Sequence, residues 1–352
     1  MTLAAELRDA ITAEGPIPFE QFQAQALYHP VFGFFSGTQL RSTKAGDFLT
    51  SPEVSPLFGE TLAGFVRTEQ ASVVGQELVI VDAGAGSGSL LRPLLAGLDA
   101  PLEAWAVEAS PAARAALEGV VPGRVVAEWH DLPQPFAGVI IANELLDNLP
   151  VSLARKTQAG WEEQWVGLNG DRLVLVPVSP RHEVAAWADQ FGDGTPVGGL
   201  VEVQLAARQW IEQALASLRN GALVVIDYGD TVEGLAPRRS QGTLRTYRSH
   251  HLGPDPLLEP GSTDITVDVN FTAAEAAAKS AGAESVIVER QDRFLAAWGL
   301  RDRLSELRNR ELELARDGDP MERLKVRSVK TEAETLLHPR GLGDFRVLVA
   351  RK

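Results

Sequence analysis

Apolar runs alternate with amphipathic segments in the middle of the chain. The runs "ELVIVDAG", "LEAWAVEA", "RVVAEW" and "GVIIANE" lie between residues 77 and 144, and helical patterns separate them. Short apolar runs bounded by turn residues are typical of buried strands. Strand, helix and strand repeating at this spacing imply right-handed crossovers and a parallel sheet. The pattern therefore predicts an α/β fold with a doubly wound, mostly parallel sheet.

The pattern changes on both sides of this core. Residues 1–75 are rich in helical patterns and loops, and they predict an N-terminal helical cap and lid on a ligand-binding domain that spans 76–352. Alternating positions punctuated by "QAG" and "LNGD" predict a β meander inserted at about 151–199, after the fourth parallel strand. A polar loop at about 230–270 is too long for a passive connection.

Composition narrows the possible functions. The 352 residues carry a formal net charge of −14, and no cluster of Lys and Arg stands out, so we expect no nucleic-acid partner. The chain has no cysteine, and its six histidines lack the spacing of zinc ligands, so we expect no metal. No apolar run approaches the roughly 20 residues of a membrane helix. With an amphipathic start and no signal peptide, these features predict a cytoplasmic protein without membrane insertion.

The stretch "VDAGAGSGSL" follows the first predicted strand and has the composition of a ligand-binding turn. Gly84, Gly86 and Gly88 let the backbone approach a ligand and expose amide groups at the start of the next helix, where an anionic group is favoured. Ser89 stands where the last glycine of the dinucleotide fingerprint would fall. A different nucleoside therefore fits better, and a tight turn without a ligand is the alternative.

Two acidic residues downstream suit the rest of a nucleoside. Glu108 ends the next strand, where its carboxylate can accept hydrogen bonds from both ribose hydroxyls. Asp131 follows the third strand and is a candidate for the adenine amino group, although a helix cap or a turn is nearly as good an interpretation.

A third polar group, "ANELLDNLP", follows the fourth strand. If a helix begins after Asn143, then Glu144 and Asp147 share one face. Two carboxylates beside a cofactor suit a cationic substrate, and a guanidinium matches their bidentate geometry. The alternative is that Asn143 caps a helix and both acids are solvated.

Several longer motifs resemble one family. The stretches "KAGDFLTSPEVSPLFGE", "VDAGAGSGSL", "ANELLDNLPV", "LVVIDYG", "GSTDITVDVNFT" and "LLHPRGLGDFRVLVA" occur here in the order seen in the MidA-like methyltransferases. That family includes the mitochondrial complex I assembly arginine methyltransferase. The similarity extends over nearly the whole chain, although the turn "DAGAGSG" departs from the Glu-Leu-Gly-Pro-Gly form of many relatives.

The resemblance implies a class I, Rossmann-like methyltransferase fold that binds S-adenosylmethionine. For the mitochondrial relatives it implies symmetric methylation of an arginine in a complex I subunit, so we expect a protein substrate carrying an arginine. Glu144, with Asp147 or Asp264 behind it, is expected to orient the guanidinium, and the glycine turn, Asn143 and Glu108 to hold the cofactor. The residues expected to close over the cofactor are Gly46, Asp47, Thr50, Ser51 and Glu53.

Two other functions are compatible with parts of this sequence. A nicotinamide-dependent oxidoreductase shares the strand, the glycine turn and the ribose carboxylate, but Ser89 and the complete motif set disfavour it. A non-catalytic assembly factor that keeps the cofactor site has the same cofactor residues, so the sequence does not separate it from an enzyme.

Overall fold

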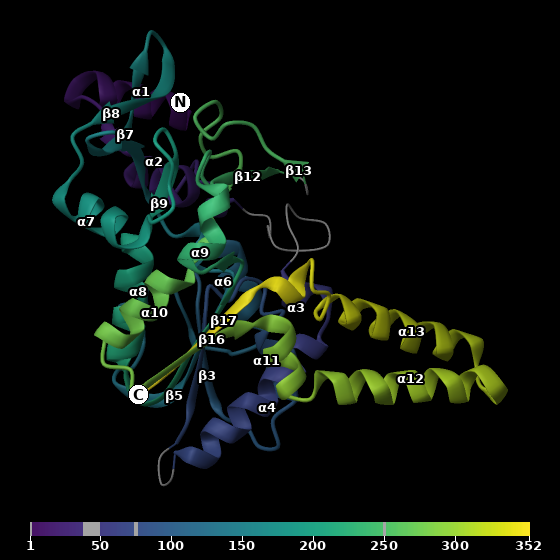
Figure 1. Ribbon diagram of the computed structural model, residues 1–352. Coiled ribbons are helices and arrows are strands. Elements are labelled where there is room, and N and C mark those ends of the chain that lie inside the picture. The colour runs from purple at the N-terminus through teal and green to yellow at the C-terminus, as the bar shows by residue number, and fades with distance from the viewer. Residues whose placement is uncertain (1, 38–49, 74–76, 249–250) are drawn as a thin grey trace.

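The computed structural model describes residues 2–37, 50–73, 77–248 and 251–352. Its centre is a seven-stranded sheet with the order β16-β17-β10-β5-β2-β3-β4 (Figure 1). The strands are β2 (Val79–Ala83), β3 (Glu103–Val107), β4 (Val125–Val126), β5 (Phe136–Asn143), β10 (Leu218–Asp227), β16 (Ser285–Arg290) and β17 (Arg346–Arg351). Strands β4, β3, β2, β5 and β10 pair in parallel, whereas β17 runs antiparallel to β10 and β16. The predicted doubly wound, mostly parallel sheet is confirmed.

Helices cover both faces of this sheet, which explains why its central strands are mostly apolar. All eight residues of β5 are buried. One face packs against α4 (Leu57–Ser72), α5 (Leu91–Ala96) and α11 (Gln291–Ala297), and the other packs against α8 (Leu205–Ser217) and α10 (Phe271–Ser280). Parallel strands buried on both faces read as continuous apolar runs rather than as alternating ones.

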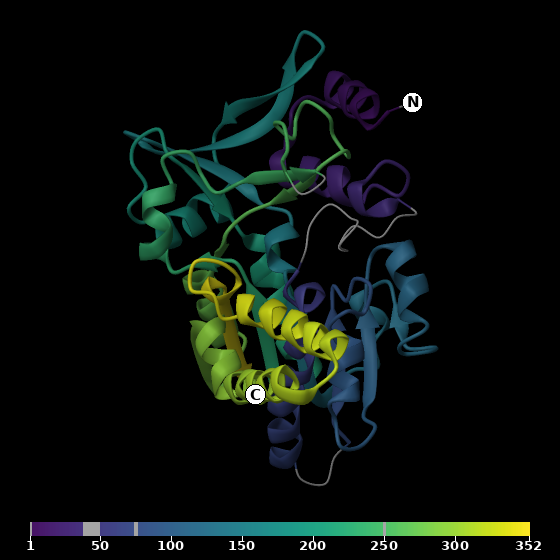
Figure 2. The same cartoon turned by 90° about the vertical axis from the view of Figure 1, so that its right-hand side faces the viewer.

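A second, five-stranded sheet is inserted after β5, close to the predicted limits. It contains β6 (Ser152–Thr157), β7 (Gly160–Asn169), β8 (Arg172–Val178), β9 (Leu200–Val203) and the short N-terminal β1 (Ile17–Pro18). Helix α7 (His182–Phe191) packs against it. Figure 2 shows this sheet as an upper tier above the main sheet.

The structure divides the predicted N-terminal cap of residues 1–75 between the two sheets. Helices α1 (Leu3–Glu14) and α2 (Phe19–Tyr28) share a hydrophobic core with the inserted sheet, and β1 pairs with β7. Helix α4 instead packs on the main sheet through Leu57, Phe58, Leu62 and Phe65, which are all buried. The sequence pattern marks these helices as amphipathic, but it does not say which sheet covers each one.

The predicted long loop at about 230–270 contains short elements. They are β11 (Gly229–Asp230), α9 (Val232–Leu235), a 3-10 turn η4 (Ala236–Arg238), β12 (Arg245–Arg248), β13 (His251–Leu252), β14 (Asp264–Thr266) and β15 (Val269–Asn270). Strands β13, β12 and β14 form a small sheet. This sheet places β14 beside the segment that follows β5, where the backbone N–H of Val267 donates to the carbonyl of Asp147 at 3.1 Å.

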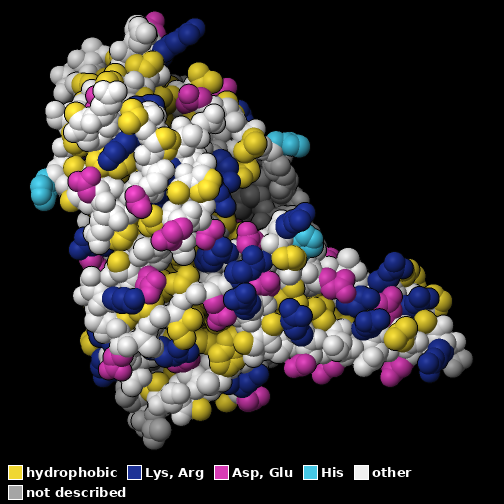
Figure 3. Space-filling model, viewed as in Figure 1, with side chains coloured by type: hydrophobic (Ala, Val, Ile, Leu, Met, Phe, Trp, Pro, Cys, Tyr) yellow, Lys and Arg dark blue, Asp and Glu magenta, His cyan; other side chains and the backbone are white. Residues whose placement is uncertain are grey.

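The charged tract near the C-terminus forms a helical hairpin. Helices α12 (Leu300–Asp317) and α13 (Pro320–Thr335) pack against each other and project from the body (Figure 1). Side chains of both signs are interspersed along it in Figure 3, which is typical of a solvent-exposed helical surface. The chain then returns through η5 (Leu342–Asp344) to β17.

Candidate functional site

The glycine turn joins β2 to α5 at the carboxyl end of the main sheet. Gly84, Gly86 and Gly88 have φ values of +69°, +52° and +79°, which favour glycine. Gly84 and Gly86 line a cavity of about 710 Å³. Gly88 does not line it; a Cβ there would lie 3.1 Å from the side chains of Leu117 and Val120. The first two glycines therefore open the site, and the third allows close packing beneath it.

Asp82 supplies an acidic group that the sequence analysis missed. It lies at the end of β2, is buried and lines the cavity. Its Oδ2 atom has no hydrogen-bond partner among the described residues. Burial, together with the nearby Glu108, raises the pKa of Asp82 to about 7. An unpartnered carboxylate oxygen in this place suits a cationic group such as the ammonium of an amino acid. Its position two residues before Gly84 is the signal that could have identified it.

Glu108 follows β3 and fastens the glycine turn. Its Oε2 accepts a hydrogen bond from the backbone N–H of Gly86 at 2.8 Å, and its Oε1 accepts one from Ser110 at 2.7 Å. Burial raises its pKa above the ordinary value. The carboxylate lines the same cavity. Its predicted bonds to ribose hydroxyls remain a prediction.

Asp131 is not among the residues that line the cavity, so its predicted contact with adenine stays a prediction. It ends the 3-10 turn η2 (Trp129–Asp131), its side chain is about half exposed, and its Oδ1 lies 3.5 Å from His130 Nε2. The neighbouring Trp129 is buried, and its indole N–H donates to Ser217 Oγ at 2.9 Å. This bond ties the turn to α8, and Glu128 and Trp129 of the turn line the cavity.

The predicted lid is described only in part. Gly46 and Asp47 lie outside the described residues. Thr50 lines the cavity and precedes the short helix α3 (Ser51–Val54), whose capping box uses the Glu53 carboxylate on the backbone N–H of Thr50 at 3.3 Å. The backbone N–H of Ser51 donates to Glu144 Oε1 at 3.1 Å. Glu53 therefore stabilises α3, and Ser51 anchors the segment beside the site.

The segment after β5 does not form the predicted helix. Asn143 is the last residue of β5, Glu144 has a φ of +51°, and only the 3-10 turn η3 (Leu146–Asn148) follows. A non-glycine residue in the left-handed region is uncommon and often marks a functional site. Glu144 is partly buried, and its Oε1 also accepts from Asn143 Nδ2 at 3.2 Å. The alternative with a helix cap and solvated acids does not describe this segment.

Asp227, at the end of β10, holds this segment in place. Its Oδ2 accepts from the backbone N–H groups of Leu146 at 3.0 Å and Asp147 at 3.3 Å, and its Oδ1 accepts from Tyr228 at 2.9 Å. Asp227 is fully buried, and burial raises its pKa well above the ordinary value. Asp227 and Tyr228 both belong to the motif "VVIDYG". The signal that could have identified Asp227 is an acidic residue at the end of an apolar strand.

A second cavity of about 860 Å³ adjoins the first, and Glu144 and Asn148 line both. Asp147 lines the second cavity; its Oδ2 accepts from the Tyr228 hydroxyl, whereas its buried Oδ1 finds no partner in the part of the chain that the structure describes. Asp264 also lines this cavity and accepts from Asn148 Nδ2 at 2.8 Å. The three predicted catalytic acids are thus brought together, and Asp147 reaches the cavity itself rather than lying behind Glu144.

The ionised forms of Glu144 and Asp147, where the two cavities meet, are disfavoured. Burial, and then the charge of Asp147, raise the pKa of Glu144 to about 8. Burial raises the pKa of Asp147 to about 6, although its hydrogen bond from Tyr228 acts in the opposite direction. Within the described ranges, no three His, Asp or Glu residues are arranged to hold a metal ion. A cation that donates hydrogen bonds would favour the ionised forms of both acids.

A family model described as "Putative S-adenosyl-L-methionine-dependent methyltransferase" matches residues 60–288 of the chain. This chain belongs to that family. A solved relative is a COG1565 superfamily member from Burkholderia thailandensis bound to S-adenosyl-homocysteine. It is 32% identical, has a TM-score of 0.85, and the alignment covers 99% of this chain and 92% of the other. The predicted family, the class I fold and S-adenosylmethionine as cofactor are confirmed, and the oxidoreductase alternative is set aside.

Curated relatives include the Drosophila melanogaster "Protein arginine methyltransferase NDUFAF7 homolog, mitochondrial", which is 28% identical over 80% of this chain and 71% of its own. The Homo sapiens "Protein arginine methyltransferase NDUFAF7, mitochondrial" is 27% identical over 86% of this chain and 74% of its own. These names contradict the predicted cytoplasmic location. That prediction was wrong because it rested on the absence of a recognisable targeting pattern. In the described part of the chain, no helix has the length and apolar character needed to span a bilayer.

The residues of the first cavity fit S-adenosylmethionine. The unpartnered Asp82 Oδ2 suits the ammonium group, and the glycine turn gives close backbone access. Asn143, whose buried Oδ1 has no hydrogen-bond partner among the described residues, also lines this cavity.

Proposed function

We propose that this chain methylates an arginine side chain of a protein, with the guanidinium held by Glu144 and Asp147 in the second cavity. The observation that carries the proposal is the unpartnered, buried Asp147 Oδ1 in a cavity that Glu144 shares with the cofactor site. The printed names of the curated relatives support arginine as the acceptor. A complex I subunit as the substrate rests on the family resemblance alone.

The chemistry requires orientation more than acid or base strength. When bound, S-adenosylmethionine supplies an electrophilic methyl group on sulfur. The guanidinium nitrogen that receives the methyl group must lie in line with the bond between sulfur and that methyl group. Two carboxylates that bind neighbouring nitrogen atoms of the planar guanidinium fix its plane. Ser51 N–H and Asn143 Nδ2 hold Glu144 Oε1, and the Tyr228 hydroxyl holds Asp147 Oδ2.

Both carboxylates also provide a place for the proton that the guanidinium must lose. Arginine has a pKa above about 12, so the proton leaves the nitrogen only as the new bond forms. Because burial raises the pKa of Glu144 to about 8, its carboxylate is a better proton acceptor than an exposed one. Removing either negative charge should slow transfer without removing the cofactor cavity.

The test compares transfer by Asp147→Asn with transfer by the wild type. A lysate is incubated with tritiated S-adenosylmethionine, and protein-bound label is counted. Loss of a charge-assisted hydrogen bond is worth about 1.5–3 kcal/mol, so the rate should fall about tenfold to a hundredfold. Affinity for S-adenosyl-homocysteine, measured by calorimetry, should stay near the wild-type value because Asp147 does not line the first cavity.

Asp255→Asn is the matched control, since Asp255 lies in the loop between β13 and β14 and does not line the second cavity. It should label at the wild-type rate. Equal labelling by Asp147→Asn and the wild type would overturn the guanidinium clamp. No labelling by any form, together with intact binding of S-adenosyl-homocysteine, would favour the non-catalytic assembly factor.

A further inference from the structure

The second cavity has opposite charges at its two ends. Glu144, Asp147 and Asp264 lie at the end shared with the cofactor site, whereas Arg238 and Arg245 line the wall formed by η4 and β12. Arg340, which is exposed, lines the cavity as well. The acidic end is accounted for by the proposed guanidinium, but the basic wall is not.

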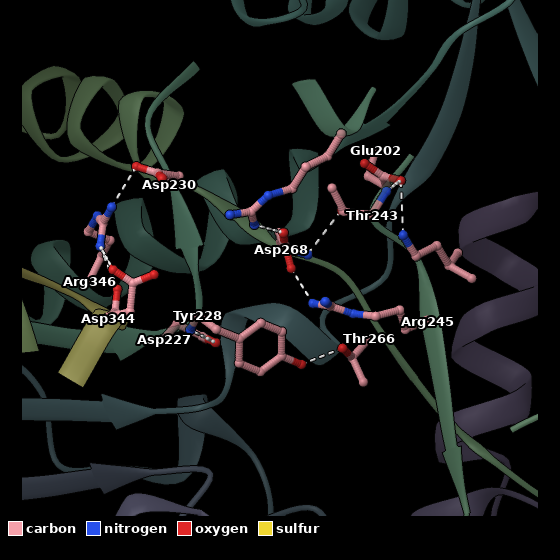
Figure 4. Close-up of polar contacts among 12 residues, drawn as sticks. Glu202, Asp227, Tyr228, Asp230, Thr243, Arg245, Thr266, Asp268, Asp344 and Arg346 are labelled. Carbon is pink, nitrogen blue, oxygen red and sulfur yellow. Dashed lines mark hydrogen bonds and ion pairs between the residues drawn. The ribbon is translucent and has the colours of Figure 1, made fainter. Parts of the chain in front are cut away.

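The positive charge of this wall is only partly neutralised. Asp268, which is buried, accepts hydrogen bonds from both Arg238 and Arg245, so one carboxylate serves two guanidinium groups. Figure 4 shows Asp268 bonded to Arg245 and to Thr243, with the Tyr228 ring close by. Another acid that lines the cavity, Asp344, is already paired with Arg290 and Arg346. The wall therefore retains a net positive charge.

Arg245 also has unused hydrogen-bonding capacity. Its Nη2 donates to Asp268, but its Nε is buried and meets no acceptor in the described ranges of the chain. Its guanidinium carbon lies 5.5 Å from the centroid of the Tyr228 ring. A buried donor without an acceptor is costly, so a ligand oxygen at this wall would be stabilising.

Asp147 and Arg245 are both in contact with Tyr228, whose hydroxyl donates to Asp147 and whose ring faces Arg245. Side chains two residues apart in an extended peptide lie about 7 Å apart on the same side. A peptide whose arginine binds at Asp147 can therefore present a second side chain, from a residue near that arginine in the sequence, to Arg245.

We propose that Arg245 forms a carboxylate-binding subsite for an acidic side chain within three residues of the arginine to be methylated. This inference rests on the proposed function and adds a rule for substrate choice. The acid pairs with the guanidinium of Arg245 and offsets the excess charge of Arg238 and Arg245 over Asp268. A substrate peptide that has the arginine but no acid near it would contact only the acidic end of the cavity.

The experiment begins by mapping the protein that the wild type labels with tritiated S-adenosylmethionine in a lysate. Mass spectrometry locates the methylated residue, and that protein is then made with each nearby Asp or Glu changed to its amide. With the wild-type enzyme, one such change should raise KM at least tenfold. With Arg245→Gln, the same change should alter KM less than twofold, because the partner of the acid is gone.

Arg248→Gln is the control: Arg248 lies on the same strand, pairs with Glu259 and does not line the cavity. With Arg248→Gln, changing the substrate's acid to its amide should still raise KM at least tenfold. Binding of S-adenosyl-homocysteine reports folding, and if Arg245→Gln fails to bind it, Arg245→Lys replaces it and should reduce the preference at least threefold. The inference is overturned if the labelled arginine has no acid within three residues, or if the preference survives in the Arg245 variant. If the label lies on a residue type other than arginine, the proposed function and this inference are both wrong.

Discussion

Replacing Glu144 with glutamine should change how the stability of the protein depends on pH. Glu144 is partly buried, and its desolvation in the fold raises its pKa from an ordinary value of 4.5 to about 8. A carboxyl whose pKa is raised in the folded state binds a proton more tightly there than in the unfolded chain. Its contribution to stability is therefore present below the unfolded pKa and is lost as the pH rises toward 8.

The structure sets the size of this effect. Each tenfold difference in proton affinity is worth about 1.4 kcal/mol, so the difference between 4.5 and about 8 gives an upper bound of about 5 kcal/mol. Local relaxation and water entry reduce such values, and we expect about 2 kcal/mol between pH 5 and pH 8.5. Glutamine keeps an oxygen that accepts from Ser51 N–H and Asn143 Nδ2, so the fold should survive.

Urea unfolding at pH 5 and pH 8.5 measures the effect for the wild type, Glu144→Gln and the exposed control Glu334→Gln. Asp82 and Asp147 titrate in the same window, so the difference between variants, not the absolute slope, isolates Glu144. Glu144→Gln should lose about 2 kcal/mol less stability than the other two proteins as the pH rises. Equal losses in all three proteins would refute the argument that burial perturbs Glu144.

Three further predictions concern the two cavities. Asp82→Asn should weaken binding of S-adenosyl-homocysteine about tenfold to a hundredfold in calorimetry, because the unpartnered Oδ2 would no longer carry a charge; unchanged affinity would show that Asp82 does not bind the ammonium group. Gly86→Val should abolish that binding while circular dichroism stays native, because a β-branched residue is strained at a φ of +52° in the cavity wall; retained affinity would count against the turn as the cofactor site. Tyr228→Phe removes a hydrogen bond that lowers the pKa of Asp147, so transfer should fall more at pH 6.5 than at pH 8.5; an equal fall at both values would make Tyr228 a packing residue only.

The main sheet and the cofactor turn could be predicted from the sequence because their signals are local. Strand β5 is buried on both faces and reads as an apolar run, and the glycines sit at positive φ directly after a strand. Asp131 shows the limit of this reasoning. Its predicted contact with adenine rests on its distance from the third strand, whereas the turn that carries it is bonded through Trp129 to Ser217, 88 residues away, which no local pattern shows.

The second cavity could not be assembled from the sequence, because its lining comes from distant parts of the chain. Asp147 follows β5, Arg245 lies on β12, and residues 339–345 come after the helical hairpin. Local patterns made residues 230–270 a polar loop, whereas pairing of β12 with β14 gives that segment its shape. Glu144, with its positive φ, lies between two long-range contacts: its side chain accepts from Ser51 N–H, and Asp227 accepts from Leu146 N–H. No local pattern encodes these contacts.

The identity of the methylated residue tests the central claim most directly. Protein labelled by the wild type with tritiated S-adenosylmethionine is hydrolysed to amino acids, and the label is separated by chromatography against methylarginine standards. The account predicts that the label elutes with methylated arginine, and that it is reduced at least tenfold with Glu144→Gln while S-adenosyl-homocysteine still binds. Label that elutes with another methylated amino acid, or that is unaffected by Glu144→Gln, would contradict it.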